Sequence, residues 1–496
     1  MARCIINIVL SILIGCVLSL PVQAESPPVQ AEDSDELQLT VQDAISIVLT
    51  HNLGLKLERI SPEIKKENLV SAESIFDPII TVSGAHSRLE TDGDPVDMES
   101  AENNVEAGIE KLYPYGTRIA LNMILQDDSN TTDSSNGNDG TSLMTVLALT
   151  QPLLKNKGDD INERQIIIAE NDFKKAELSF KQAVIDTIAQ TKQLYWQLRS
   201  ANEQLKVQEK SLLLAKQFLS EVEEKVKVGS AAVLEILEAR AEVASREDAL
   251  IRAEYDLMNS QDNLLSYIYG GLQEIRPVRC VQPPLIEEQV IQEDELLQKA
   301  MDLRSEPQSI AYDISSAEVD SIYWKNQKKA QLDLIGSLGY NKALSEEENR
   351  PLSYQDYYSG EIKLSLQFPW GFRKDSANYR AAMQTLKQSK IQRDRIEAQI
   401  RLEIRTAVRS VTSAHKRFQT AALAAQLAEE KLSAEQEKYK SGLSTSYSVL
   451  LYQRDWIDAM VNRVNAIINY QLAIVFLNKT AGITLEQNGI EIKALY

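Results

Sequence analysis

The chain has 496 residues and a net charge of −19, and charged residues make up 25% of the sequence. This acidic balance argues against nucleic-acid binding, which needs a basic surface. The 3 His and 3 Cys are scattered, and the sequence contains no Cys pair, HExxH, glycine-rich phosphate loop or G-x-S-x-G. We therefore expect neither an enzyme nor a bound metal or cofactor.

The first 24 residues have the pattern of a secretory signal. Arg3 supplies positive charge, residues 5–20 are apolar, and Val22 to Ala24 form a small-residue cleavage site. Lipoprotein processing at Cys16 is the alternative. Cleavage after Ala24 leaves Cys280 alone, so no intramolecular disulfide is expected. The mature sequence shows no run of about 18 apolar residues, which argues against a spanning helix and leaves a closed β-barrel as the way across a membrane.

After a polar leader, residues 40–74 have a helical pattern, with Pro62 predicting a break or a new helix start. Alternating apolar and polar residues then predict six β-strands. They cover residues 76–86, 105–112, 117–126 and 143–153 in the first half, and residues 332–340 and 360–368 in the second.

The connections between the predicted strands differ in length. Polar loops are expected at residues 87–104, 127–142 and 341–359, whereas Pro114-Tyr115-Gly116 predicts a tight turn. Long loops on one side and a short turn on the other are typical of outer-membrane barrels. An ordinary soluble β-hairpin domain is the alternative.

Each group of strands is followed by a long segment with apolar residues every seven positions. This spacing predicts a left-handed coiled coil. The first helix is expected from Asn162 to Val226, about 97 Å long, and Gly229 and Gly442 are expected to end the long helices of the two halves. The repeated positions include Leu198, Leu205, Leu212, Leu219 and Val226 in the first half and Ile404, Val411, Phe418, Ala425, Leu432 and Tyr439 in the second.

The second half repeats the plan of the first. Ala44 aligns with Ala300 at an offset of 300 − 44 = 256, and Gly229 aligns with Gly442 at 442 − 229 = 213. The offset falls because the first half holds roughly forty extra residues, as in a repeat architecture with one insertion. The extra residues account for the additional pair of predicted strands, at residues 105–126.

This layout resembles the TolC-type outer-membrane efflux protein family over residues 40–490. The resemblance rests on Leu149 to Leu154 at the strand-to-helix passage, and on a glycine followed by an apolar helix start in each half. These glycine segments are Lys227-Val228-Gly229 with Val233 to Arg240, and Tyr439 to Gly442 with Val449 to Arg454. The resemblance implies a mixed α+β fold: a trimeric outer-membrane β-barrel continued by a periplasmic coiled-coil tunnel, with two structural repeats per chain. The family usually supplies four strands per chain, so six is a departure.

On this basis the chain is divided into eight parts. They are a signal peptide (1–24), a leader with periplasmic helices (25–75), the barrel strands (76–155) and helical hairpin (156–272) of the first repeat, a linker with periplasmic helices (273–331), the strands (332–369) and hairpin (370–482) of the second repeat, and a tail (483–496).

The implied function is that of the outer-membrane channel in a tripartite efflux or type I secretion system, a passive export duct. Its implied partners are two further copies of the chain, a periplasmic adaptor protein, an inner-membrane pump and outer-membrane lipid. A non-conducting structural coiled-coil protein of the envelope is the alternative. The adaptor is expected to contact the helical tips, at Val228, Gly229 and Ser230 and at Gly442, Leu443 and Ser444.

The tunnel gate is expected at the same tips. Glu235 and Glu238 lie three residues apart and so share a helix face. The resemblance carries a gate-closing role to Glu235 and to Tyr439. Ser444 stands where the family has an arginine, and Ser448 and Leu451 stand where it has paired aspartates, so the gate chemistry must differ. A solvated helix face is the alternative for the two glutamates.

Overall fold

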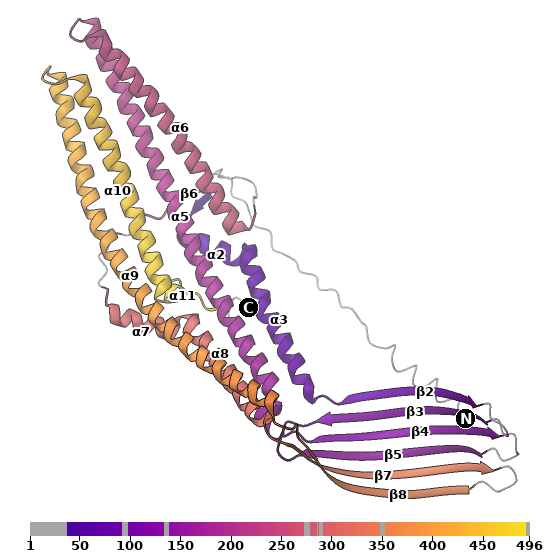
Figure 1. Ribbon diagram of the computed structural model, residues 1–496. Helices are drawn as coiled ribbons and strands as arrows, with labels where there is room; N and C mark the ends of the chain where they lie inside the picture. The colour runs from indigo at the N-terminus through magenta and orange to yellow at the C-terminus, as the bar shows by residue number, and fades with distance from the viewer. Residues whose placement is uncertain are drawn as a thin grey trace.

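The computed structural model describes residues 37–91, 98–132, 138–271, 278–284, 286, 291–347 and 353–492. The predicted signal segment, Cys16 and the leader as far as residue 36 lie outside the described residues. In this part of the chain, a long layer of helices joins one end of a six-stranded sheet (Figure 1).

The sheet contains all six predicted strands in the order β2-β3-β4-β5-β7-β8, and every neighbouring pair is antiparallel. The additional pair, β3 and β4, lies inside the sheet between β2 and β5 and does not fold away from it. The strands are β2 (Ile79–Thr91), β3 (Met98–Leu112), β4 (Arg118–Thr132), β5 (Asn138–Pro152), β7 (Gln331–Glu347) and β8 (Ser353–Gln367).

The strands are longer than the sequence pattern predicted, and the expected loops at 87–104, 127–142 and 341–359 are mostly wrong. Arg88 pairs with Ala101, and Asp127 pairs with Thr141, whose hydroxyl donates to the Asp127 carboxylate over 2.9 Å. The ladder is made by backbone groups, so it continues where both faces of a strand are polar. The polar ends of these strands could therefore not be predicted from alternating apolar and polar residues.

The Pro114-Tyr115-Gly116 turn lies at the end of the sheet that joins the helices. Gly116 has φ +95°, and its N–H donates to Tyr113 O over 2.8 Å. The Gly158 N–H donates to Tyr115 O over 3.2 Å, which ties the turn to the start of α4 (Asp159–Asn162). Strands β2, β4 and β7 end, and strands β3, β5 and β8 begin, at the far end of the sheet (Figure 1).

The long helices form two hairpins. The helix expected from Asn162 to Val226 is confirmed as α5 (Arg164–Lys227), 64 residues long, and it is followed by α6 (Val233–Tyr269). The second hairpin consists of α9 (Arg373–Lys440) and α10 (Ser446–Thr480). Of the predicted repeat positions, some are buried and the rest are half-buried. The buried ones are Leu198, Ile404, Val411, Ala425, Leu432 and Tyr439, and the half-buried ones are Leu205, Leu212, Leu219, Val226 and Phe418.

The helical layer is four helices wide along its length. Toward the tips, the order of contacts is α6, α5, α10 and α9 (Figure 1). Toward the sheet, α3 (Leu53–Glu73) packs on α5, and α8 (Ser305–Gln327) packs between α5 and α9. The shorter α7 (Glu293–Leu303) packs on α9, and α11 (Thr484–Gln487) follows α10.

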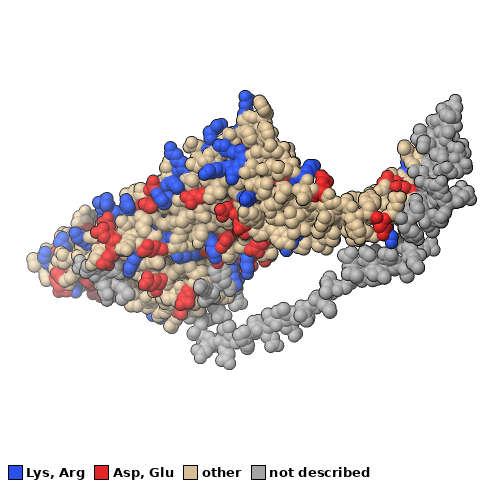
Figure 2. Space-filling view, turned by 90° about the horizontal axis from the view of Figure 1, so that it is seen from below, with Lys and Arg blue, Asp and Glu red and all other residues tan. Residues whose placement is uncertain are grey.

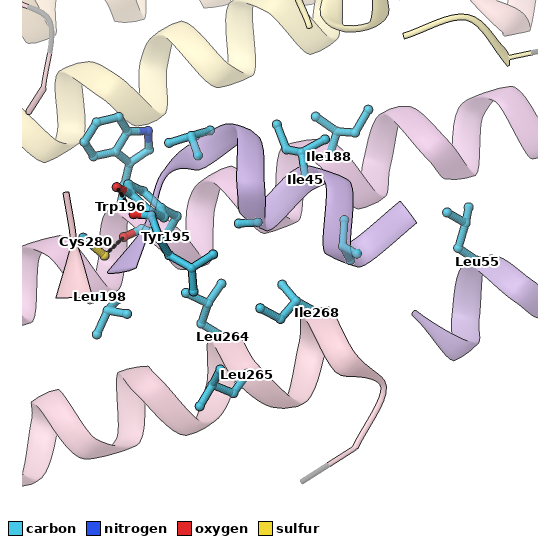
Figure 3. Close-up of a cluster of buried hydrophobic side chains, with 14 of the residues drawn as sticks. Ile45, Leu55, Ile188, Tyr195, Trp196, Leu198, Leu264, Leu265, Ile268 and Cys280 are labelled. Atoms are coloured by element: carbon cyan, nitrogen blue, oxygen red, sulfur yellow. Dashed lines mark hydrogen bonds between the residues drawn. The ribbon is translucent and has the colours of Figure 1, made fainter. Parts of the chain in front are cut away.

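The largest cluster of buried side chains lies about midway along α5. There α5 and α6 meet α2 (Val41–His51) and a parallel pair of short strands, β1 (Leu37–Leu39) and β6 (Val278–Cys280) (Figure 3). The Tyr195 hydroxyl donates to Leu39 O over 3.1 Å and accepts from the Gln282 N–H over 3.2 Å. Burial raises the pKa of the Cys280 thiol to about 11, so this thiol stays protonated and inert.

One expectation about the helices is corrected. The predicted break at Pro62 is wrong, because α3 runs through this buried proline. The proline lacks an N–H, so the helix has one backbone hydrogen bond fewer at this position. The break lies at Asn52, whose side chain accepts from the Leu55 N–H over 2.9 Å and donates to Tyr267 O over 2.7 Å. By length and composition, α10 is also apolar enough to cross a membrane. In the structure α10 packs on α9 and α5 within the layer, and 33% of its most apolar 18-residue stretch is buried.

Candidate functional site

The turns of the two helical hairpins lie at the end of the helical layer opposite the sheet (Figure 1). Gly229 and Gly442 follow the ends of α5 and α9 with φ +74° and +76°. The next N–H groups, of Ser230 and Leu443, reach back to Lys225 O and Lys438 O over 2.8 Å in both cases. A glycine in the left-handed conformation with this back-bond is a common helix stop, so the helix ends predicted at both glycines are confirmed.

Apolar side chains project from both tips. Val228 and Leu443, the residues next to the two glycines, are each 79% exposed. Exposed apolar side chains grouped at one end of a molecule make that end a candidate interaction surface. The other exposed members of this apolar tip surface are Val233, Leu234, Leu237, Tyr447 and Leu451.

Behind the tips, the two hairpins pack on each other through a small apolar cluster around Tyr439. Its ring lies 5.2 Å from that of Phe218, and the Lys225 ammonium lies 3.6 Å from the ring centre. Burial and the negative charge of Glu235 raise the pKa of the Tyr439 hydroxyl to about 12, so this group is a hydrogen-bond donor at neutral pH. The remaining buried members of the cluster are Val222, Ala239, Val449 and Leu450.

Three glutamates of α6 face the second hairpin and bond to it. Tyr439 donates to Glu235 over 3.2 Å, Ser446 donates to Glu238 over 3.3 Å, and Arg454 donates to Glu242 over 2.7 Å. The spacing of three and four residues places all three glutamates on one helix face. We call these contacts the cross-hairpin ladder. The shared face predicted for Glu235 and Glu238 is therefore present, and it lies toward α9 and α10 of the same chain.

Glu242 was not singled out from the sequence, although it is the most buried member of the ladder. Its side chain is 3% exposed and also accepts from Arg246 Nε over 2.7 Å. Burial alone would raise the pKa of Glu242, but hydrogen bonds and positive charge from Arg454 and Arg246 outweigh it and hold the pKa below its usual value. The available signal was the Glu-to-Arg spacing of four residues within α6.

Two of the other predicted gate residues, Ser444 and Ser448, form hydrogen bonds within their own hairpin. The Ser444 hydroxyl donates to Glu435, and this bond, together with Lys438 at 3.2 Å, lowers the pKa of the Glu435 carboxyl. Ser448 lies 3.0 Å from the Thr445 hydroxyl at the start of α10. Leu451 is 43% exposed and belongs to the apolar tip surface.

The tips combine apolar packing with hydrogen bonds between the two hairpins. Across the described ranges, no group of three or more His, Cys, Asp or Glu side chains is placed to hold a metal ion. The tips therefore present an exposed apolar surface, and behind it the cross-hairpin ladder joins the two hairpins through one glutamate at each contact.

Comparisons with known proteins agree on what this chain is similar to. The family described as "Outer membrane efflux protein" matches residues 96–268. A search of the curated proteins found no match. Among solved structures, the Campylobacter jejuni CmeC outer membrane channel superposes with a TM-score of 0.65 at 18% identity, over 97% of this chain and 97% of that one.

Two further structures give the same result. The outer-membrane channel OprN has a TM-score of 0.66 at 13% identity, over 89% of both chains. The open state of the Neisseria gonorrhoeae MtrE outer membrane channel has a TM-score of 0.63 at 16% identity, over 94% of this chain and 98% of that one. The resemblance predicted from the sequence is thus confirmed: the matching family is described as an outer membrane efflux protein family, and the three matched structures are outer membrane channels.

Proposed function

We propose that this chain, which resembles the outer membrane efflux protein family, is the outer-membrane channel of a bacterial export system. It would act as a passive duct through the periplasm and outer membrane of a Gram-negative cell, in a tripartite efflux or type I secretion system. The observation that carries this proposal is the two-faced sheet.

One face of the sheet is apolar and exposed, and the other is mostly polar. Along β3 and β4 the polar-face side chains are less exposed than those of the apolar face, as expected for the inner side of a curved sheet. Figure 2 shows that charged side chains of both signs cover the helices, whereas much of the sheet is uncharged up to its far end. The exposed apolar face includes Ile80, Val82, Ile109, Leu121, Leu147, Leu338, Ile362 and Leu364, and the polar face includes Glu102, Glu106, Glu110, Asn122, Gln126, Glu361 and Lys363.

An apolar outer face and a polar inner face are what a barrel in lipid requires. The outward residues are far too exposed for a soluble sheet: Ile362 is 85% exposed and Ile80 is 73% exposed. Lipid also requires every backbone group to be paired, so the two free edges of the sheet must be closed. We therefore propose a homotrimer, in which three sheets form one barrel and three helical layers form one tunnel.

The order of elements supports the proposal of two repeats per chain. A pair of shorter helices (α2 and α3, then α7 and α8) is followed by strands and then by a long helical hairpin, and this sequence occurs twice. Each repeat would place one hairpin in the tunnel wall.

The apolar tip surface is the proposed docking site for a periplasmic adaptor protein, which would link the channel to an inner-membrane pump. Val228, Gly229 and Ser230 lie on one tip, and Gly442, Leu443 and Ser444 lie on the other. The chain contains no nucleotide-binding loop in its sequence, so energy for export would come from the pump.

We place the tunnel gate at the same end, at Glu235, Glu238 and Tyr439, with Ser444, Ser448 and Leu451 on the facing tip. In this structure the two glutamates bond to the neighbouring hairpin, so opening would separate the hairpins and release the carboxylates toward the lumen. Six carboxylates near one axis would favour cations. Single-channel recording of a Glu235→Gln, Glu238→Gln double variant tests this, and unchanged cation preference would contradict it.

The proposed function is tested on the purified full-length protein. Membrane fractionation and unboiled gel electrophoresis should recover an outer-membrane trimer, and planar lipid bilayers should record discrete conductance steps. A trimer that conducts nothing would favour the structural coiled-coil alternative. A soluble monomer would contradict both.

A further inference from the structure

We propose that three copies of this chain close an eighteen-stranded barrel in which β8 of one copy pairs with β2 of the next. We propose further that the hairpin β3–β4 widens this barrel to the width of the helical tunnel. This inference rests on the proposed channel function and deepens it, because the width decides which cargo can leave through the outer membrane.

The two edges of the sheet suit each other. With six strands in strict alternation, β2 and β8 run in opposite directions, so β8 of one copy meets β2 of the next as an antiparallel pair. Their lengths differ by only two residues, at 13 for β2 and 15 for β8. The pairing also keeps the faces consistent, since Ile80 and Val82 of β2 and Ile362 and Leu364 of β8 all belong to the exposed apolar face. Such long edges, left open, would pair with other chains.

The number of strands sets the width of the barrel. Six strands from each of three copies give 3 × 6 = 18 strands. With strands about 4.8 Å apart and tilted by about 40°, the perimeter is about 113 Å and the backbone diameter about 36 Å. The same arithmetic gives about 24 Å for a barrel of twelve strands, which is what the chain would form without β3 and β4.

The helical layer sets the width of the tunnel independently. The layer is four helices wide, so three copies place 3 × 4 = 12 helices around the axis. At an interaxial distance of 8–10 Å, such a ring has a diameter of about 31–38 Å. Eighteen strands therefore continue the tunnel at its own width, whereas twelve strands would narrow it by about a third.

The cargo implied by this width is bulky. Inward side chains take about 5 Å from each wall, half the spacing between packed sheets, which leaves an opening of about 26 Å instead of about 14 Å. An α-helix with its side chains is about 10–12 Å across. The wider mouth therefore admits two helices side by side, so partly folded polypeptides join small molecules as possible cargo.

The width is measured by polymer exclusion from the sheet side of single channels, which reports on the barrel mouth independently of the tips. Polyethylene glycols with hydrodynamic radii up to about 13 Å should enter and lower the conductance of the full chain. A variant lacking residues 98–132 should form a four-stranded sheet and exclude polymers above about 7 Å. A cut-off near 7 Å in the full chain would overturn the proposal.

Two cysteine experiments remain decisive if the deletion variant does not fold. Ser83→Cys on β2 is combined in turn with Ser359→Cys and Ser365→Cys on β8, and oxidation should give covalent trimers for at least one pair. Asn122→Cys, on the polar face of β4, should let a charged thiol reagent reduce the current, whereas its neighbour Leu121→Cys on the apolar face should not.

The outcomes separate the inference from the function on which it rests. A monomer without conductance overturns both. A conducting trimer with a narrow mouth, no cross-link between β2 and β8 and no effect at Asn122 leaves the channel function intact and overturns the eighteen-stranded barrel.

Discussion

Replacing Glu242 with Gln is expected to loosen the contact between the two helical hairpins. The carboxylate is 3% exposed and accepts from Arg246 Nε at 2.7 Å and from Arg454 Nη2 at 2.7 Å and Nε at 3.3 Å. A Gln amide keeps one acceptor oxygen but turns an NH2 group toward an arginine donor and removes the negative charge.

The size of the effect follows from the exposure of each partner. Charge-assisted hydrogen bonds contribute about 1.5–3 kcal/mol when buried. Arg454 is 59% exposed, so water can hydrogen-bond to its guanidinium in place of the lost carboxylate and reduce the cost. Arg246 is 14% exposed and is left with an unpaired buried charge. We therefore expect local opening of α6 to become easier by about 2 kcal/mol, which is about a 30-fold change in its equilibrium constant.

Hydrogen exchange on the assembled protein measures this local opening. Peptides covering the first half of α6 should exchange about 30-fold faster in the Glu242→Gln variant, and a double-mutant cycle with Arg454→Gln should show coupling of about 1 kcal/mol. The matched control is Glu223→Gln, which breaks the exposed Glu223–Arg240 pair at 3.0 Å and should change exchange by about twofold or less.

The same carboxylate predicts a pH dependence. Its folded-state pKa lies below the value of the unfolded chain, so its contribution is complete above the unfolded pKa and is lost as pH falls through the folded pKa. The opening equilibrium of α6, obtained as the ratio of observed to intrinsic exchange rates, should therefore increase on acidification in the wild type and much less in Glu242→Gln. Equal exchange rates in wild type and variant at neutral pH would refute the reasoning.

Three further outcomes are expected. Gly229→Val should impair export while trimers persist on unboiled gels. A Cβ at this position would meet nothing within 4 Å, but φ +74° is costly for a β-branched residue. Normal export would count against the tip assignment. An impermeant thiol reagent on intact cells should label Ser134→Cys, which lies outside the described residues, and not Tyr115→Cys; the reverse pattern would invert the topology. Tyr439→Phe removes the donor to Glu235 and should increase single-channel conductance, and a conductance equal to that of the wild type would place the gate elsewhere.

Much of the fold could be predicted because it depends on local periodicity. A seven-residue repeat commits α5 and α9 to long helices wherever they pack, and the two glycines that end them, Gly229 and Gly442, need only a backbone conformation that other residues rarely adopt. Alternation likewise located all six strands, since one face of each is apolar.

The rest depended on contacts between distant segments. The polar ends of β2 to β5 are strands only because a neighbouring backbone pairs with them, and the helix break at Asn52 depends on Tyr267, more than two hundred residues away. The sequence does not distinguish Glu242 from a solvated glutamate, because its partner Arg454 lies in the other hairpin and contacts it only in the folded chain. Sequence periodicity thus determined which elements form, whereas the tertiary structure decided where they end and which charges become buried together, because both depend on partners far away in the chain.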